Sequence, residues 1–467
     1  MKRSKKMIVL VAVLAVICAA TFALTRYEEK QEEIKNSDAV ILEIPMENVQ
    51  SLSWNYGSAG LAFHRGEESW LYDDDEAFPV SEEKITGILS HFEAFGASFI
   101  IENVEDRSQY GLDDPECVIC LSTEDISYEI KLGAFSKMDE QRYVDIGDGN
   151  VYLISVDPMD YLESSLSGMI QHDDTPAFDT VTAISFDGLD GCTITMAEDS
   201  ADTYSADDLY FAQLGGKNLP LDTDSVTSYL NTITKLTLLD YATYNATEEE
   251  LAGFGLDEPE LTVTVSYTDA DENDSTFVLH IGRNVQEQEA YEKADDAGED
   301  LPDVTKYVRI GDSQIVYELS ESDYLTLSGV TYDDLRHREV FWAVFENVTQ
   351  IDVELENETH SLIYGPSEED EDELYWIYNG SETDISDLWS ALKGLSADSF
   401  TDESPSGKEE IGLTVYLDSE SFPQIEIRLY RYDGSLCLAA VDGESVSLVS
   451  RSDVMKLVEA VQAIVLN

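Results

Sequence analysis

One amphipathic helical pattern occurs three times in this chain, and it constrains the fold more than any other feature. Apolar residues stand at offsets 0, 3, 4, 7 and 10 from Ile85, from Val226 and from Ile385. This spacing places them on one face of an α-helix. Four residues before each pattern stands a residue type that favours helix N-caps: Ser81, Asp222 and Ser381. Three helical stripes with matched flanks predict an internal duplication.

Alternating strand patterns recur in the same order around each predicted helix. A Val-x-x-apolar-x-apolar segment precedes it, starting at Val49, Val181 and Val348. Period-2 alternation over short segments predicts antiparallel meanders, with each helix packed on a sheet. We therefore predict an α+β fold of three repeated modules, each an antiparallel sheet with one packed helix, preceded by an N-terminal transmembrane helix. The first, second and third modules cover residues 45–170, 176–335 and 340–467, the third being divergent.

The first 26 residues differ sharply in charge from the rest of the chain. An uncharged apolar run, Met7–Leu24, follows a basic stub. The chain after residue 26 contains 22 basic residues and all 97 acidic ones. The positive-inside rule predicts a cytoplasmic stub (1–6), a transmembrane anchor (7–26), a stalk (27–44) and an extracytoplasmic remainder. A cleaved secretory signal, or lipidation at Cys18 after cleavage, remains open as an alternative.

The excess of acidic residues bears on which partners the protein can bind. An acidic surface repels nucleic acids and anionic lipid headgroups, so we expect no nucleic-acid partner. Divalent cations or a basic partner are the complementary expectations. The aromatic content of 10% and the hydrophobic content of 43% are ample for packed cores, so the charge does not indicate general disorder.

One acidic segment is the candidate for metal binding. The residues Asp269, Asp271, Asn273 and Asp274 begin like a calcium-binding loop. The sixth position lacks the glycine of an EF-hand, and His280 stands at the twelfth position in place of glutamate. We predict weak divalent-cation binding at these four residues and no other cofactor.

No residue pattern points to catalysis. The chain lacks a G-x-S-x-G elbow, a phosphate loop and a dinucleotide fingerprint, and its six histidines show no metal-ligand spacing. Cys117 and Cys120 are three apart on a predicted strand, so they face opposite ways and are expected to pack rather than pair. His337 is expected to lie in a solvated seam between the second and third modules. We predict no catalytic residues and a protein that is not an enzyme.

Two segments carry a family resemblance. Tyr110–Pro115 and Phe254–Pro259 share an aromatic-Gly-Leu-acid-acid-Pro turn, and each is followed by a strand that ends in glycine, at Gly133 and Gly282. With the Tyr-Val and Val-Tyr segments that come next, these residues resemble an uncharacterised bacterial family, domain of unknown function 4340. The resemblance implies an anchor in the bacterial cell membrane, an extracytoplasmic body and, for some members, association with ABC-transporter subunits. It supplies no catalytic residue.

These observations together predict a non-enzymatic, membrane-anchored, extracytoplasmic interaction or scaffold protein. Its role as an accessory subunit of an ABC-type membrane transport complex is implied by the resemblance alone. The alternatives are a binding module for a cell-envelope glycan or peptide and, with the least support, an envelope hydrolase. The sequence does not determine the oligomeric state.

Overall fold

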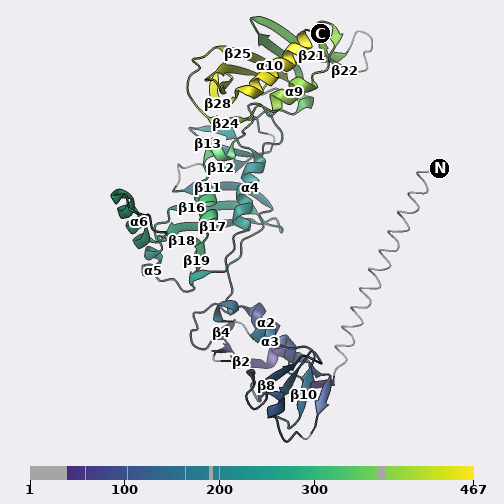
Figure 1. The fold of residues 1–467 in the computed structure, drawn as a ribbon, viewed down its shortest axis with the longest axis vertical. Helices are drawn as coiled ribbons and strands as arrows, with labels where there is room; N and C mark the ends of the chain where they lie inside the picture. The colour runs from purple at the N-terminus through teal and green to yellow at the C-terminus, as the bar shows by residue number, and fades with distance from the viewer. Residues whose placement is uncertain are drawn as a thin grey trace, which may run out of the picture. The chain divides into compact units, whose positions relative to one another are not determined.

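The computed structural model describes residues 39–466 except 58, 103, 163–164, 189–192, 199 and 367–373 (Figure 1). Packing divides the chain into two compact units, residues 1–173 and 174–467, and each is described by itself. The second and third predicted modules both lie in the second unit.

The first unit contains an eight-stranded antiparallel sheet in the spatial order β4-β3-β2-β7-β8-β9-β10-β6. Its strands are β2 (Val49–Tyr56), β3 (Ala59–Arg65), β4 (Trp70–Tyr72), β6 (Phe99–Ile101), β7 (Cys117–Thr123), β8 (Ser127–Ser136), β9 (Gln141–Asp145) and β10 (Val151–Ile154). A small separate sheet pairs β1 (Ala39–Leu42) with β5 (Phe95–Ala97). The helices are η1 (Met46–Asn48), α2 (Glu82–Glu93), η2 (Ser108–Tyr110), α3 (Met159–Leu162) and η3 (Leu166–Met169).

The second sheet has nine strands in the order β14-β13-β12-β11-β16-β17-β18-β19-β15. These strands are β11 (Thr180–Asp187), β12 (Thr193–Met196), β13 (Tyr210–Leu214), β14 (Lys217–Pro220), β15 (Tyr241–Thr243), β16 (Leu261–Thr268), β17 (Asp274–Arg283), β18 (Lys306–Ile310) and β19 (Val316–Leu319). The helices of this region are α4 (Thr223–Thr234), α5 (Glu248–Gly253), α6 (Val285–Ala297), α7 (Glu321–Ser328) and α8 (Tyr332–Leu335).

The third sheet also has nine strands, in the order β23-β22-β21-β20-β25-β26-β27-β28-β24. They are β20 (Val348–Leu355), β21 (Glu358–Pro366), β22 (Leu374–Tyr378), β23 (Ser381–Glu382), β24 (Ala397–Phe400), β25 (Glu409–Leu417), β26 (Gln424–Arg431), β27 (Leu436–Val441) and β28 (Glu444–Ser450). A short helix, η4 (Phe345–Asn347), precedes β20. Helices α9 (Ser386–Lys393) and α10 (Arg451–Val465) lie side by side on this sheet (Figure 1).

The three large sheets share one strand order. Numbered from the first strand of each sheet, the order in the second and third sheets is 4-3-2-1-6-7-8-9-5. The first sheet has the same order without a fourth strand. In each case a helix follows the strands of one edge and covers the sheet with the predicted apolar stripe. Ile85, Val226 and Leu388 of these helices are fully buried.

The predicted fold class was wrong, because the described part of the chain is mostly β. Strands make up 41% of it and helices 23%, in four antiparallel sheets. Nor does each sheet carry only one helix. A helical stripe of twelve residues is a strong periodic signal, whereas a strand of three to five residues shows only two or three alternations. Sequence periodicity therefore indicates fewer strands than the structure contains.

The predicted transmembrane helix of residues 7–26 lies outside the described residues. Within the described ranges, no helix is both long enough and apolar enough to cross a membrane. The stub and most of the predicted stalk likewise fall outside the described part of the chain.

The helix starts agree with two of the three predicted caps. The Ser81 side chain accepts a hydrogen bond from the Lys84 backbone N–H, and the Asp222 side chain accepts from two backbone N–H groups of α4. Ser381, in contrast, belongs to β23, and α9 begins at Ser386. There the Asp384 carboxylate accepts from the Ser386 backbone N–H at 2.9 Å.

The aromatic-Gly-Leu turn of the first module packs against the strand glycine that follows it. Gly111 adopts a left-handed φ of +69°, which favours glycine. A Cβ on Gly133 would stand 2.4 Å from the Tyr110 carbonyl oxygen, too close for any side chain. The Tyr110 ring packs on Tyr143, with ring centroids 4.8 Å apart. The turn, strand β8 and strand β9 therefore form one packed corner.

The second module repeats this corner. Gly255 has the same φ of +69°, and a Cβ on Gly282 would stand 2.4 Å from the Gly255 carbonyl oxygen. The Phe254 ring packs on Tyr307 at 4.5 Å. The recurrent sequence motif thus has a steric cause: two backbone segments approach too closely for a side chain on either glycine.

Candidate functional site

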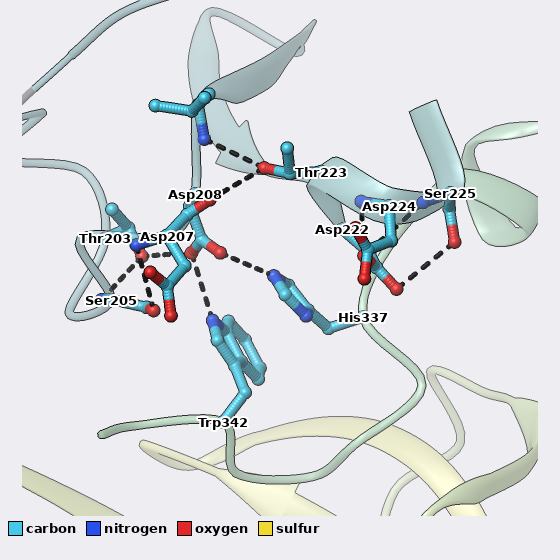
Figure 2. Close-up of polar contacts among 11 residues, drawn as sticks. Thr203, Ser205, Asp207, Asp208, Asp222, Thr223, Asp224, Ser225, His337 and Trp342 are labelled. Carbon is cyan, nitrogen blue, oxygen red and sulfur yellow. Dashed lines mark hydrogen bonds and ion pairs between the residues drawn. The ribbon is translucent and has the colours of Figure 1, made fainter. Parts of the chain in front are cut away.

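Residues 203–208, in the connection between β12 and β13, carry three buried polar side chains. Thr203, Ser205 and Asp208 are at most 9% exposed. Buried polar groups are costly unless they are hydrogen-bonded. The hydrogen-bond partners of these side chains come from both the second and the third modules (Figure 2).

Asp208 is the centre of this cluster. Its Oδ1 accepts a hydrogen bond from Nε2 of His337 at 2.8 Å, and its Oδ2 accepts from Nε1 of Trp342 at 3.0 Å. The Thr203 hydroxyl also donates to Oδ2. The side chain of Asp208 is 2% exposed and that of His337 is 12% exposed. Both carboxylate oxygens are therefore satisfied by donors that are buried or partly buried.

The start of helix α4 holds the loop in place. The Thr223 hydroxyl donates to the Asp207 carbonyl oxygen at 2.8 Å and accepts from the Leu209 backbone N–H at 3.0 Å. Asp222, the N-cap of α4, donates its own backbone N–H to the Leu335 carbonyl at the end of α8. The same helix terminus thereby fixes the loop before β13 and the chain just before His337 (Figure 2).

An aromatic cluster surrounds the polar one. Tyr204 contacts Phe341 at 5.7 Å, Trp342 at 4.7 Å and Phe422 at 5.8 Å between ring centroids. It packs against the hydrophobic core of the third module although it belongs to the second. Burial raises the pKa of the Tyr204 phenol well above its ordinary value. The second module therefore packs a partly buried aromatic side chain against the core of the third.

The geometry at Asp208 suits a structural joint better than proton transfer. The His337 ring stacks on Trp342, with centroids 4.2 Å apart and an angle of 10° between the planes. A catalytic triad needs a hydroxyl or thiol that donates to the histidine. Here the Thr203 hydroxyl donates to the carboxylate instead. We call Thr203, Tyr204, Asp208, His337 and Trp342 the module joint.

Sequence reasoning missed most of the module joint. It placed His337 in a solvated seam between modules, whereas the His337 side chain is 12% exposed and its ring bonds to Asp208. Asp208 was not singled out, and its partners lie 129 and 134 residues further along the chain. In a chain with 97 acidic residues, no local pattern distinguishes this aspartate.

The predicted cation-binding residues lie in the hairpin turn between β16 and β17. Oδ1 of Asp269 accepts from the backbone N–H groups of Asp271 and Asn273, both at 2.9 Å, and the Asn273 amide lies 3.3 Å away. The hydrogen bond from the Asn273 backbone is the main cause that lowers the pKa of Asp269. Asp274 instead pairs with Thr268 at the start of β17. The turn brings Asp269 and Asn273 together, and cation binding there stays a prediction.

Other sequence candidates find ordinary structural positions. Cys117 is buried and Cys120 is half-buried on the opposite face of β7, and both thiols are free. Burial raises the pKa of Cys117 to about 12, so this thiol stays protonated at neutral pH. Among the residues that the structure describes, no group of three or more His, Cys, Asp or Glu side chains is arranged to hold a metal ion.

The fold and the joint define a class of protein built from repeated antiparallel sheets, in which the second and third modules are joined by buried and partly buried side chains. Comparison with known families then places the chain: the model of the family described as Domain of unknown function (DUF4340) matches residues 70–208 and 215–414. The chain belongs to this family, as the two aromatic-Gly-Leu turns indicate. No match was found among curated proteins or solved structures.

Proposed function

We propose that this protein is a non-enzymatic interaction protein of the cell envelope, a rigid scaffold that acts outside the membrane as an accessory to an ABC-type transport complex. The observation that carries the proposal is the module joint. A side chain of the second module packs against the core of the third, and a buried carboxylate accepts hydrogen bonds from both modules. Such a connection resists bending, which is what a scaffold requires.

Two further observations support this proposal. Within the joint, Thr203, His337 and Trp342 all donate to the Asp208 carboxylate, so this polar chemistry serves cohesion. The charge asymmetry of the first 26 residues favours export of the acidic remainder and attachment at the membrane by the apolar N-terminal segment. The link to a transport complex derives from the family resemblance.

The experiment is cross-linking of the full-length protein in its native membrane, followed by affinity purification and mass spectrometry. We expect permease or ATPase subunits in stoichiometric amounts. An Asp208→Ala variant, which loosens the joint, should recover fewer of them, while an Asp207→Ala variant serves as the matched control because Asp207 is exposed. Recovery of the protein alone, or with wall fragments only, would contradict the scaffold role and favour a glycan-binding module.

A further inference from the structure

The second module has an open groove between two helices, at a place that an aromatic ring occupies in the first module. In the first module, Tyr161 of α3 packs on the outer surface of α2 and stays 45% exposed. Its ring lies 3.4 Å from the position that a Cβ on Gly87 would occupy, and its centroid is 4.8 Å from the His91 ring. The chain therefore covers this part of α2 with its own aromatic side chain.

The equivalent groove of the second module lies between α4 and α7. Counting from the first apolar residue of each helical stripe, Ser228 stands where Gly87 stands and Thr232 where His91 stands. Thr326 replaces Tyr161, because it precedes the buried Leu327 as Tyr161 precedes the buried Leu162. These small residues leave the groove unfilled, with a volume of about 360 Å³.

The lining of this open groove is suited to an apolar side chain. It comprises Ser228, Tyr229, Thr232, Leu325, Thr326, Gly329, Val330, Asp334 and Leu335. Leu325 stands at the groove with 58% of its surface exposed, a large fraction for a leucine. The third module differs, since its equivalent groove presents Asp387 and Lys456 at the positions of Gly87 and Tyr161. Charged groups at both positions disfavour an aromatic ring there.

The charge around the groove selects among occupants. Helices α4, α7 and α8 carry only acidic charges: Asp224, Glu321, Asp323, Asp333 and Asp334. Glu321 pairs with Lys306 and Asp333 with Arg336, which leaves Asp224, Asp323 and Asp334 without a basic partner among the ion pairs of the described residues. Lysine and arginine are missing from all three helices. A second copy of this strongly acidic chain would be repelled, whereas a basic segment would be attracted.

We propose that the groove between α4 and α7 binds a partner protein through an aromatic side chain that is flanked by lysine or arginine. The inserted ring takes the place that Tyr161 takes in the first module, and the flanking cations face the acidic helix surfaces. This inference rests on the proposed interaction function and names the surface and the partner chemistry that would serve it. An aromatic anchor in a pocket with a charged rim is a common source of binding energy at protein interfaces.

The test uses the full-length chain in its native membrane, with a photo-reactive benzoylphenylalanine in place of Leu325. A second protein carries the same cross-linker at Leu239, which is 61% exposed and does not line the groove. We expect position 325 to capture a partner peptide that contains an aromatic residue within a few positions of lysine or arginine. Position 239 should not capture that peptide.

Two substitutions at Thr326 then separate groove binding from other effects. Thr326→Tyr introduces the residue type that occupies the equivalent position in the first module. It should reduce the yield of the cross-link at least about tenfold, because that is the effect of losing one buried anchor. Thr326→Ala leaves the groove open and should preserve the yield. Because Thr326 is exposed, both variants should fold, and circular dichroism checks this.

The outcomes distinguish this proposal from the proposed function. Equal cross-linking in the Thr326→Tyr and Thr326→Ala proteins would overturn the groove as the binding site while leaving the scaffold role intact. A captured peptide without an aromatic residue, or one from a second copy of this chain, would also overturn it. If wild-type membranes yield no partner by any cross-linker, the interaction function itself fails, and the groove proposal with it.

Discussion

Two aspartates of the second module have nearly the same hydrogen-bond inventory and opposite settings. Asp269 accepts from two backbone N–H groups and an amide within its own turn, all within four residues, and it faces solvent. Asp208 also accepts from three donors, but two of them come from more than 120 residues away and the carboxylate is buried. The number of hydrogen bonds is therefore a poor guide to importance, whereas burial and sequence separation of the partners are informative.

The physical reason lies in what replaces each interaction when it is lost. Around Asp269, water can take over every hydrogen bond, so the net contribution is small. Around Asp208, removal of the carboxylate leaves a buried hydroxyl and two partly buried ring N–H groups without their acceptor, so much of the desolvation cost remains. Four substitutions compare buried with exposed interactions, in order of decreasing expected loss of stability.

Asp208→Ala should give the largest loss of stability. The substitution leaves the Thr203 hydroxyl, the His337 ring N–H and the Trp342 indole N–H without their acceptor, which costs about 3–5 kcal/mol for a buried charged partner. Urea unfolding followed by tryptophan fluorescence measures the loss. The exposed neighbour gives the control, since Asp207→Ala should change stability by less than about 0.5 kcal/mol. Equal effects of the two substitutions would contradict a special role for Asp208.

Tyr204→Ala should come next. The change removes a ring that packs on Phe341, Trp342 and Phe422, and truncation of such an aromatic costs about 2–4 kcal/mol when the site is partly exposed. Tyr204→Phe keeps the ring and should lie within about 1 kcal/mol of wild type. A differential-scanning experiment should find the loss in the unit of residues 174–467, with the transition of residues 39–173 unchanged. A phenylalanine variant as unstable as the alanine variant would show that packing is not the main term.

Gly282→Ala should have an intermediate effect, because a Cβ there would meet the Gly255 carbonyl oxygen at 2.4 Å and force the corner apart. Overpacking of this kind costs about 1–3 kcal/mol. Gly253→Ala is the matched control in the same corner: nothing stands within 4 Å of its Cβ position, and no change or a slight gain is expected. Chemical denaturation of the two variants in parallel measures the difference. A tolerated alanine at position 282 would refute the steric account of the family motif.

Asp269→Asn should have the smallest effect, with no resolvable change in the urea midpoint at neutral pH. The hydrogen bond from the Asn273 backbone lowers the pKa of the wild-type carboxyl, so a titration by carbon NMR should find its midpoint below 3.8. The lowered pKa of Asp269 sets how its contribution to stability depends on pH. A folded-state pKa below the unfolded value contributes stability that is present above the unfolded pKa and lost as pH falls through the folded pKa. A midpoint at or above 3.8 would mean that the turn does not hold in solution.

The elements that sequence reasoning located well are those whose causes lie within a few residues. The helices at Ile85 and Val226 and their caps at Ser81 and Asp222 depend on neighbours up to four positions apart. The two glycine turns were also visible because the motif is repeated. The cap at Ser381 was misplaced because the third copy diverges, and the strand content was underestimated because short strands give weak periodic signals.

The repeated helical stripes, the family and the acidic character of the surface could be predicted from the sequence, because these depend on residue types and short spacings. Tertiary structure alone decided which of many carboxylates is buried, which aromatic side chain of one module enters the core of the next, and which copy of a recurrent groove is left open. Each of those outcomes depends on residues that are far apart in the sequence, and the free energy that selects them comes from desolvation and close packing. A short sequence pattern does not indicate which side chains will be desolvated or closely packed.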